Sequence, residues 1–152
     1  MKETVYDIIK FIILGITTFI LLNIIESTFL VTYLKKNLLT IQLAALAINV
    51  SIFSLIISKI QSIKKTHPEF NVSSILKSLK SALKEQIIII VIGILVLSVI
   101  DSFISKIVYK SITMESILEI ALIAIFYNTI QIMWDTGDGM FHLVQAEERI
   151  SK

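Results

Sequence analysis

The sequence has no cysteine, two histidines, one proline and four glycines among its 152 residues. Without cysteine the chain forms no disulfide, thiolate metal site or cysteine nucleophile. The histidines, His67 and His142, are too few for a histidine-based metal centre. The scarcity of glycine and proline leaves few residues for turns. The sequence also lacks the segments of about ten residues with alternating hydrophobicity that are typical of an outer-membrane barrel. The sequence therefore predicts an all-α protein without a metal or cofactor.

Apolar residues dominate what is present. The hydrophobic share is 55% and the mean hydropathy is +0.86, well above the values of soluble domains. Charged residues cluster between long apolar segments, which predicts four transmembrane helices near residues 8–25, 38–58, 83–104 and 117–134. The second segment is the clearest, because its 21 uncharged residues match the roughly 20 that cross a bilayer.

The other three segments are shorter. Uncharged runs of only 15 residues, Gln86–Ile100 and Ile120–Trp134, mark the third and fourth spans, so both are expected to borrow flanking residues. The first segment is interpreted as an uncleaved membrane anchor. The bulky run Leu22–Glu26 that follows it offers no cleavage site for a signal peptide.

The basic residues predict the orientation. With four spans, both termini and the loop of residues 59–86 share one side, which holds ten of the 14 lysines and arginines and is predicted to be cytoplasmic. The other side holds Lys35, Lys36, Lys106 and Lys110. If one short span failed to cross, the termini would lie on opposite sides. The abundance of lysine and isoleucine is typical of an AT-rich bacterial genome, which indicates a bacterial inner membrane.

The loop of residues 59–86 is expected to be a basic helical hairpin that extends the second and third helices. Apolar residues keep helical spacing beyond the second span, at Ile56, Ile60 and Ile63. Pro68 ends that helix, and Asn71 or Ser73 caps the next one. An apolar stripe then continues into the third span: Ile75, Leu76, Leu79 and Leu83.

The C-terminal tail, residues 135–152, is predicted to lie on the cytoplasmic side. The run Asp135–Gly139 is rich in turn-forming residues, so we expect the fourth helix to end there. A short helix over Met140–Ile150 then lies at the membrane interface or packs on the hairpin.

Small and polar side chains recur along two spans. On the fourth, spacings of three and four residues place on one helix face Ala121, Ala124, Asn128, Gln131 and Asp135. The second span carries two comparable stripes: Gln42, Ala45 and Asn49, and Ala47, Ser51, Ser54 and Ser58. Such faces pack helices together, and those of the second span are expected to meet the fourth helix or a second copy of the chain. The alternative is a wetted pore through a homo-oligomer, lined by Gln42, Asn49, Asn128, Gln131 and Asp135.

No set of residues predicts catalysis. The triplet Asp135-Thr136-Gly137 matches that of aspartic proteases, but their chemistry needs two paired carboxylates, whereas this triplet ends a predicted membrane helix. Calcium requires six to eight oxygen ligands, more than Asp135 and Asp138 provide. No ionisable group lies at the centre of a span, which argues against a proton-coupled transporter. We expect no enzymatic activity.

The hairpin presents a lysine surface, defined here as Lys64, Lys65, Lys77, Lys80 and Lys84. These side chains orient the chain and attract anionic lipid, at about 1 kcal/mol per lysine near the surface. A second interpretation is that they dock an acidic cytoplasmic protein. Direct nucleic-acid binding is disfavoured, because no aromatic or arginine side chain accompanies the lysines.

The layout resembles that of small inner-membrane proteins of bacterial anti-phage systems, such as the KwaA subunit of the Kiwa system and RexB-like exclusion proteins. The likeness lies in the second span, residues 38–47, in its exit through Ser58-Lys59-Ile60, and in the placement of the basic loop. It implies an oligomeric membrane assembly that senses envelope perturbation or recruits a soluble effector.

Three functional hypotheses follow from these features. The first is a non-enzymatic, homo-oligomeric scaffold or sensor that recruits a soluble cytoplasmic partner to the membrane. The second is an oligomeric ion channel or membrane-permeabilising effector. The third, a small transporter, is disfavoured by the lack of ionisable groups inside the spans.

Overall fold

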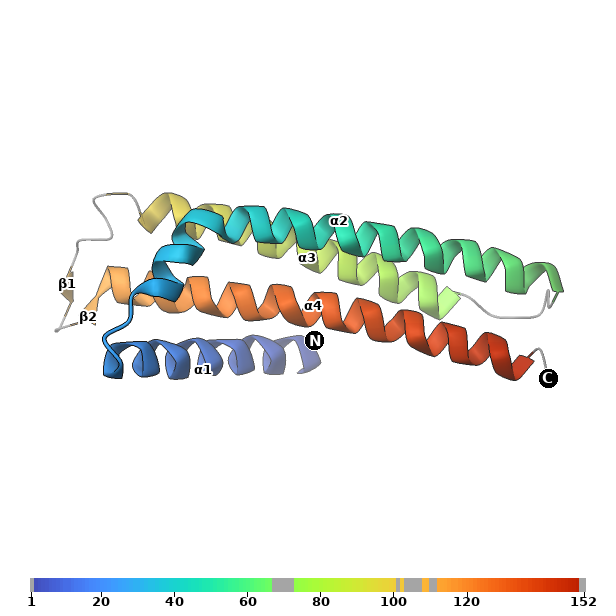
Figure 1. The fold of residues 1–152 in the computed structure, drawn as a ribbon, viewed down its shortest axis with the longest axis horizontal. Coiled ribbons are helices and arrows are strands. Elements are labelled where there is room, and N and C mark those ends of the chain that lie inside the picture. The colour runs from blue at the N-terminus through green and yellow to red at the C-terminus, as the bar shows by residue number, and fades with distance from the viewer. Residues whose placement is uncertain (1, 67–72, 101, 103–107, 110–111, 151–152) are drawn as a thin grey trace.

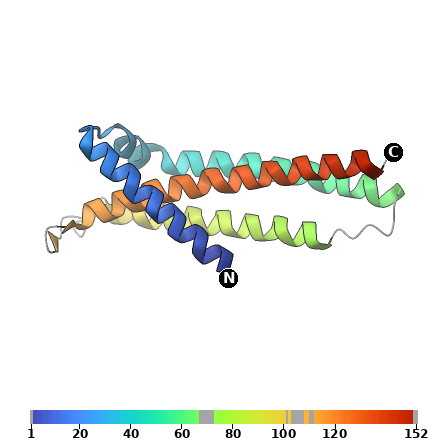
Figure 2. The ribbon, with the colours of Figure 1, turned by 90° about the horizontal axis from the view of Figure 1, so that it is seen from below.

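The computed structural model describes residues 2–66, 73–100, 102, 108–109 and 112–150. Four helices account for nearly all of them: α1 (Lys2–Ile24), α2 (Phe29–Thr66), α3 (Ser73–Ile100) and α4 (Met114–Ile150). A two-residue antiparallel ladder precedes α4, with Val108–Tyr109 (β1) paired to Ile112–Thr113 (β2). Figure 1 shows α2, α3 and α4 running lengthwise together, whereas α1 covers only half of their length. In the second view α1 crosses the other helices diagonally (Figure 2).

Three helices of the described chain are long and apolar enough to cross a membrane, over Phe29–Lys65, Ile75–Ile100 and Met114–Phe141. The all-α membrane fold predicted above is therefore confirmed in this coarser form. The third and fourth spans gain their length from flanking residues, as expected, because α3 and α4 continue through the charged flanks. The shorter apolar segment is Ile9–Ile24 in α1.

Helix α1 ends in a Schellman motif. The N–H of Ser27 bonds to the carbonyl of Leu22 at 2.9 Å, and that of Glu26 to Asn23 at 3.2 Å. Glu26 has a φ of 51°, the left-handed conformation that this motif requires at its turning residue. The motif satisfies the last carbonyls of α1 and reverses the chain into α2 within a few residues.

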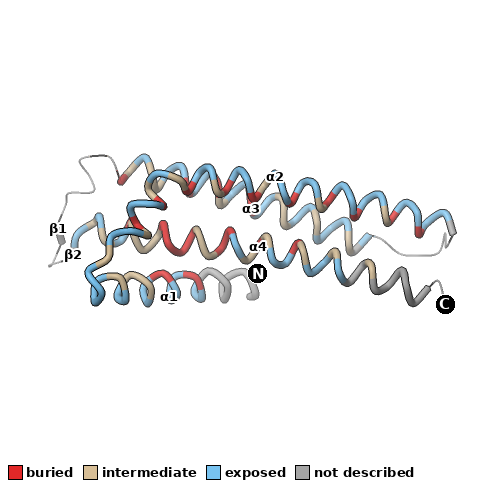
Figure 3. Tube along the Cα trace, viewed as in Figure 1, coloured by how far each residue is buried: buried red, intermediate tan, exposed pale blue. Residues whose placement is uncertain are grey.

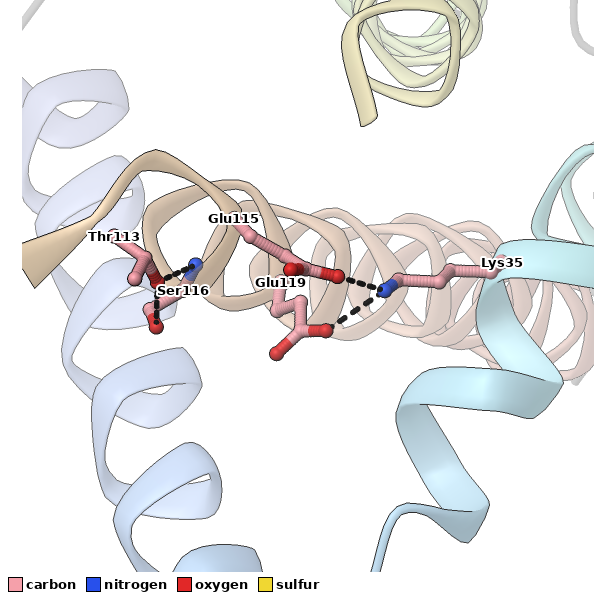
Figure 4. Close-up of polar contacts among 5 residues, drawn as sticks. All are labelled: Lys35, Thr113, Glu115, Ser116 and Glu119. Atoms are coloured by element: carbon pink, nitrogen blue, oxygen red, sulfur yellow. Dashed lines mark hydrogen bonds and ion pairs between the residues drawn. The ribbon is translucent and has the colours of Figure 1, made fainter. Parts of the chain in front are cut away.

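Helix α4 begins with a side-chain cap. The hydroxyl oxygen of Thr113 accepts a hydrogen bond from the backbone N–H of Ser116 at 3.2 Å, and the two hydroxyls lie 2.7 Å apart (Figure 4). Threonine is a favoured residue at this position because it satisfies an otherwise unpaired N–H of the first turn. Glu115, in that turn, complements the positive end of the helix dipole.

The apolar core has two parts. The first lies in the half that α1 covers and joins α2, α3 and α4 through Leu34, Leu38, Ile100, Leu122 and Ile123, among others. The second lies towards the other end and is built on Phe53, Ile56, Ile60 and Ile63 of α2. Figure 3 shows the buried positions as a stripe on each helix, with exposed positions between them. Exposed apolar side chains around this bundle are what a lipid-facing surface requires.

The second core cluster closes the ends of α2 and α3. Helix α2 reaches Thr66, as the isoleucine spacing predicts, and α3 begins at Ser73. Leu79 and Leu83 of α3 pack against the α2 isoleucines, but Leu76 is exposed and does not belong to the packed stripe. The predicted stop at Pro68 and the alternative cap at Asn71 lie outside the described residues. So do Lys106 and Lys110, and the last part of the predicted third span.

The predicted turn at Asp135–Gly139 is wrong, since α4 continues through it to Ile150. Each glycine in a helix interior costs about 1 kcal/mol relative to alanine, but tertiary contacts outweigh that cost here. Thr136 is buried and its hydroxyl bonds to the carbonyl of Ile132 at 2.8 Å. One turn later Met140 packs on the second core cluster. The predicted separate helix is therefore part of α4, and Met140 is the residue of this segment that packs on the second core cluster.

Helix α1 approaches α4 closely at a glycine. A Cβ atom on Gly15 would lie 2.8 Å from the carbonyl oxygen of Ile120 and 3.4 Å from the Cβ of Ala124. Nearby, the hydroxyls of Thr18 and Tyr127 are 3.1 Å apart, so they are hydrogen-bonded. Small residues with one interhelical hydrogen bond are the usual means by which membrane helices associate.

We expect Gly15→Ala to lower the stability of the protein by about 1–3 kcal/mol, because the added methyl group forces α1 away from α4. The matched control is Gly139→Ala, where nothing lies within 4 Å of the new methyl group. That change should leave stability equal or raise it by up to about 1 kcal/mol through helix propensity. Thermal unfolding in detergent measures both; equal effects would contradict the close contact.

Candidate functional site

The predicted amides of α2 are buried inside the protomer. Gln42 and Asn49 are 1% and 0% exposed. The side-chain amide of Gln42 donates to the carbonyl of Ile89 at 3.1 Å, and that of Asn49 donates to Oε1 of Gln86 at 2.8 Å. Both partners belong to α3. The expected burial against protein is thus observed, but the neighbour is α3, neither the fourth helix nor a second copy.

The two amides occupy positions of a heptad repeat. Buried residues of α2 recur at intervals of seven, at Gln42, Asn49, Ile56 and Ile63. In packed helices, a polar residue at such a core position selects the register in which it meets a polar partner. A shift of one turn between α2 and α3 would separate Asn49 from Gln86. The amides therefore specify how these two helices align.

Not every buried polar atom in this cluster has a partner. Gln42 Oε1, Asn49 Oδ1 and Gln86 Nε2 are buried and make no hydrogen bond. Gly93 leaves the space that the Gln42 amide fills, since a Cβ there would lie 2.6 Å from Gln42 Oε1. An unpaired buried polar group costs about 1–3 kcal/mol of stability. The cluster therefore selects one alignment of α2 and α3 but lowers the stability of the fold.

The predicted polar face of α4 is divided. Ala124 and Asn128 are buried, whereas Gln131 is partly exposed and Asp135 is exposed. The amide of Gln131 donates to Oδ1 of Asp135 at 2.6 Å, one turn along the same helix. Within the described residues, Gln131 and Asp135 bond to each other, whereas the amides of α2 bond to α3.

The second polar stripe of α2 faces outwards. Ala47, Ser51, Ser54 and Ser58 are all exposed on the side opposite the heptad positions. The hydroxyl of Ser51 bonds back to the carbonyl of Ala47 at 2.9 Å, which satisfies it without a partner helix. This small-residue stripe is therefore available to another molecule along the length of the span.

All members of the lysine surface are exposed, and they lie near the ends of α2 and α3 that meet beyond α1. Lys64 and Lys65 occupy the last turn of α2, where positive charge interacts favourably with the helix dipole. Lys77, Lys80 and Lys84 follow in the first four turns of α3. The apolar second core cluster supports both groups from inside. The lysine surface is thus carried on packed helices.

An ion-pair cluster at the opposite end was not predicted. Lys35 Nζ lies 3.1 Å from an oxygen of Glu115 and 2.8 Å from one of Glu119, joining α2 to α4 (Figure 4). Glu119 and Lys35 are only partly exposed, so this pairing is screened less than a surface pair. Sequence reasoning missed it because the partners lie 80 and 84 positions apart.

Three packing residues were also missed. Gln86 was counted as the first uncharged residue of a span, and Gly15 and Gly93 only as part of the low glycine total. A glycine or amide inside an apolar helix is the available signal for a close helix contact, although it does not name the neighbour. Among the described residues, no group of three or more histidine, aspartate or glutamate side chains is placed to hold a metal ion.

Comparisons with known proteins add no functional assignment. No family model, curated protein or solved structure matches this chain. Its function must therefore be inferred from the geometry described above.

The Asn49–Gln86 pair is testable by a double-mutant cycle. We expect Asn49→Leu or Gln86→Leu alone to destabilise the protein by about 1–3 kcal/mol, because each leaves its buried partner unpaired. The double variant should recover most of that loss, since both polar groups are gone. Unfolding in mixed detergents measures the free energy of unfolding of each variant. Gln131→Leu, which removes the partly exposed Gln131–Asp135 bond, is the control and should be nearly neutral. Additive losses would show that the two amides do not depend on each other.

Proposed function

We propose that this protein is a non-enzymatic membrane scaffold that holds a basic helical platform at the membrane for an acidic soluble partner. The observation that carries this proposal is the continuation of α2, α3 and α4 as packed helices beyond the end of α1, with the lysine surface on them. A mere connector between two spans would not need an apolar core of its own.

The helix lengths support an extension outside the bilayer. At 1.5 Å per residue, the 38 residues of α2 and the 37 of α4 measure about 57 and 55 Å. A bilayer's hydrocarbon core is about 30 Å thick. Even at a tilt of about 40° the hydrocarbon takes only about 39 Å of helix, so at least roughly a third of each helix extends beyond it.

Charge favours an acidic partner for this extension. The exposed lysines lie on two adjacent helix ends, and positive charge of this density steers association with negatively charged surfaces. A channel would need polar side chains facing a shared axis. Gln42 and Asn49 instead bond to α3 within the protomer, which favours the scaffold over the pore.

We place the platform in the cytoplasm of a bacterium, with four passes and both termini on that side. Support comes from the excess of basic residues at this end and from the antiparallel course of the helices, which takes the N-terminus of α1 and the C-terminus of α4 in the same direction. The resemblance in layout to anti-phage membrane subunits suggests recruitment of a defence effector as the biological setting.

Charge reversal tests the platform. In pulldowns from native membranes, the wild-type protein should retain a soluble partner at low salt and lose it at high salt. K77E/K80E/K84E should lose that partner at all salt concentrations, whereas K36E, an exposed lysine at the other end of α2, should retain it. Recovery of the wild-type protein alone at every salt concentration would refute the partner.

The scaffold is proposed to be a homo-oligomer that associates through the small-residue stripe of α2. Ala47, Ser51, Ser54 and Ser58 leave a shallow face on which a second helix backbone can approach closely. That face points away from the protomer's own core and interrupts an otherwise bulky lipid-facing surface.

The lack of native cysteine allows a direct test of this contact. Ser54→Cys should form disulfide-linked dimers on mild oxidation in native membranes, because two copies of the stripe bring their Cβ atoms within about 4.5 Å. Leu95→Cys, on the exposed face of α3, is the matched control and should remain largely monomeric. Equal cross-linking of the two variants would indicate random collision and refute the stripe as an interface.

A further inference from the structure

An apolar groove lies along α4, after the residues that Gly15 and Thr18 of α1 contact. It has a volume of about 370 Å³ and is lined by Ile130, Met133, Trp134, Gly137, Asp138 and Phe141. Trp134 and Phe141 are 73% and 71% exposed, among the most exposed large apolar residues of the described chain. Gly137 opens the groove between them because it has no side chain.

The groove follows the stretch of α4 that Gly15 and Thr18 of α1 contact. The close contacts of α1 with α4 involve Ile120, Ala124 and Tyr127. In both views the N-terminus of α1 lies about midway along α4, and the rest of α4 continues past it (Figures 1 and 2). The first exposed residue of the groove, Ile130, follows Tyr127 by less than one turn.

The position of Trp134 matches the thickness of a bilayer. It lies 20 residues after Met114, the first residue of α4, which is about 30 Å along the helix axis. At the opposite end of the bundle, Phe29 and Tyr33 are also exposed, and their rings stack with centroids 6.0 Å apart. Membrane proteins carry such aromatic side chains at both interfaces with water.

The charged residues agree with these two levels. On α4 no charged residue occurs between Glu119 and Asp135, immediately after Trp134. On α2 the corresponding uncharged stretch runs from Asn37 to Ser58, and on α3 from Gln86 to Ile100. On all three helices the uncharged stretch therefore ends, and charged residues resume, at the end of the bundle where the groove lies.

We propose that this groove is a lipid-contact site, with Trp134 seated at the boundary between acyl chains and headgroups of the leaflet from which the platform emerges. Ile130 and Met133 then face the acyl chains, and the indole N–H is free to donate to the lipid carbonyl region. A second copy of the chain is a poorer occupant. The described residues that line the groove are six and all belong to α4, whereas a stable protein interface uses about 20–30 residues on each side.

The proposal can be tested without a label, because Trp134 is the only tryptophan in the chain. The protein is reconstituted in phosphatidylcholine vesicles whose acyl chains carry bromine at a shallow or a deep position. We expect blue-shifted emission and at least twofold stronger quenching by the shallow bromines. Stronger quenching by the deep bromines would place Trp134 inside the hydrocarbon, and no quenching by either would place it outside the membrane; both results would overturn the proposal.

Moving the tryptophan supplies matched controls. W134F/Y33W should show the same preference for shallow quenchers from the opposite interface. W134F/F141W moves the indole seven residues, or about 10 Å, along α4 and should reduce quenching at both depths. Thermal unfolding verifies that each variant is folded. If the quenching of Trp134 rises as the protein is diluted with lipid, a second copy of the chain covers the groove at high protein concentration. That result would also overturn the proposal. These outcomes do not depend on whether a soluble partner exists.

Discussion

Packing against α4 is the constraint on which the rest of the structure depends, because each of the other three helices contacts it. Gly15 brings α1 against its backbone, Lys35 ties α2 to its first turns, and Met140 closes the far end of the α2–α3 pair. A helix surrounded in this way must remain continuous, since a break would leave backbone groups unpaired in an apolar setting. Further along, the buried Thr136 and the packing of Met140 on the second core cluster keep α4 continuous through two glycines.

Polar groups inside the bundle have a different role from the apolar core. Lipid is as apolar as leucine, so apolar contacts alone do not select one alignment of two membrane helices over another. The Asn49–Gln86 bond and the fit of Gln42 against Gly93 do so, because each is lost when the helices slide. Their unsatisfied atoms show that this alignment is obtained at some expense of stability.

The periodic features could be predicted from the sequence, and the pairwise features could not. The helical spacing of Gln42, Ala45 and Asn49 predicted a face buried against protein, and the isoleucines after Ser58 predicted the length of the helix. The identity of the facing residues was not accessible, because Gln86 and Glu119 are close to their partners only after the helices pack. The turn prediction at Asp135–Gly139 failed for a related reason. The sequence shows that each glycine lowers helix stability by about 1 kcal/mol, but it does not show the tertiary contacts of Thr136 and Met140 that offset this cost.

The uninterrupted helices connect the half of the molecule that holds the buried amides to the lysine surface. Lys64 and Lys84 stand on the same helices that carry Asn49 and Gln86, so the alignment chosen by the buried amides also sets the spacing of the exposed charges. An acidic partner would meet charges at a set height above the bilayer, because no flexible linker intervenes along α2 or along α3. A scaffold needs that property, whereas a hydrophilic loop of the same charge would offer the attraction without the geometry.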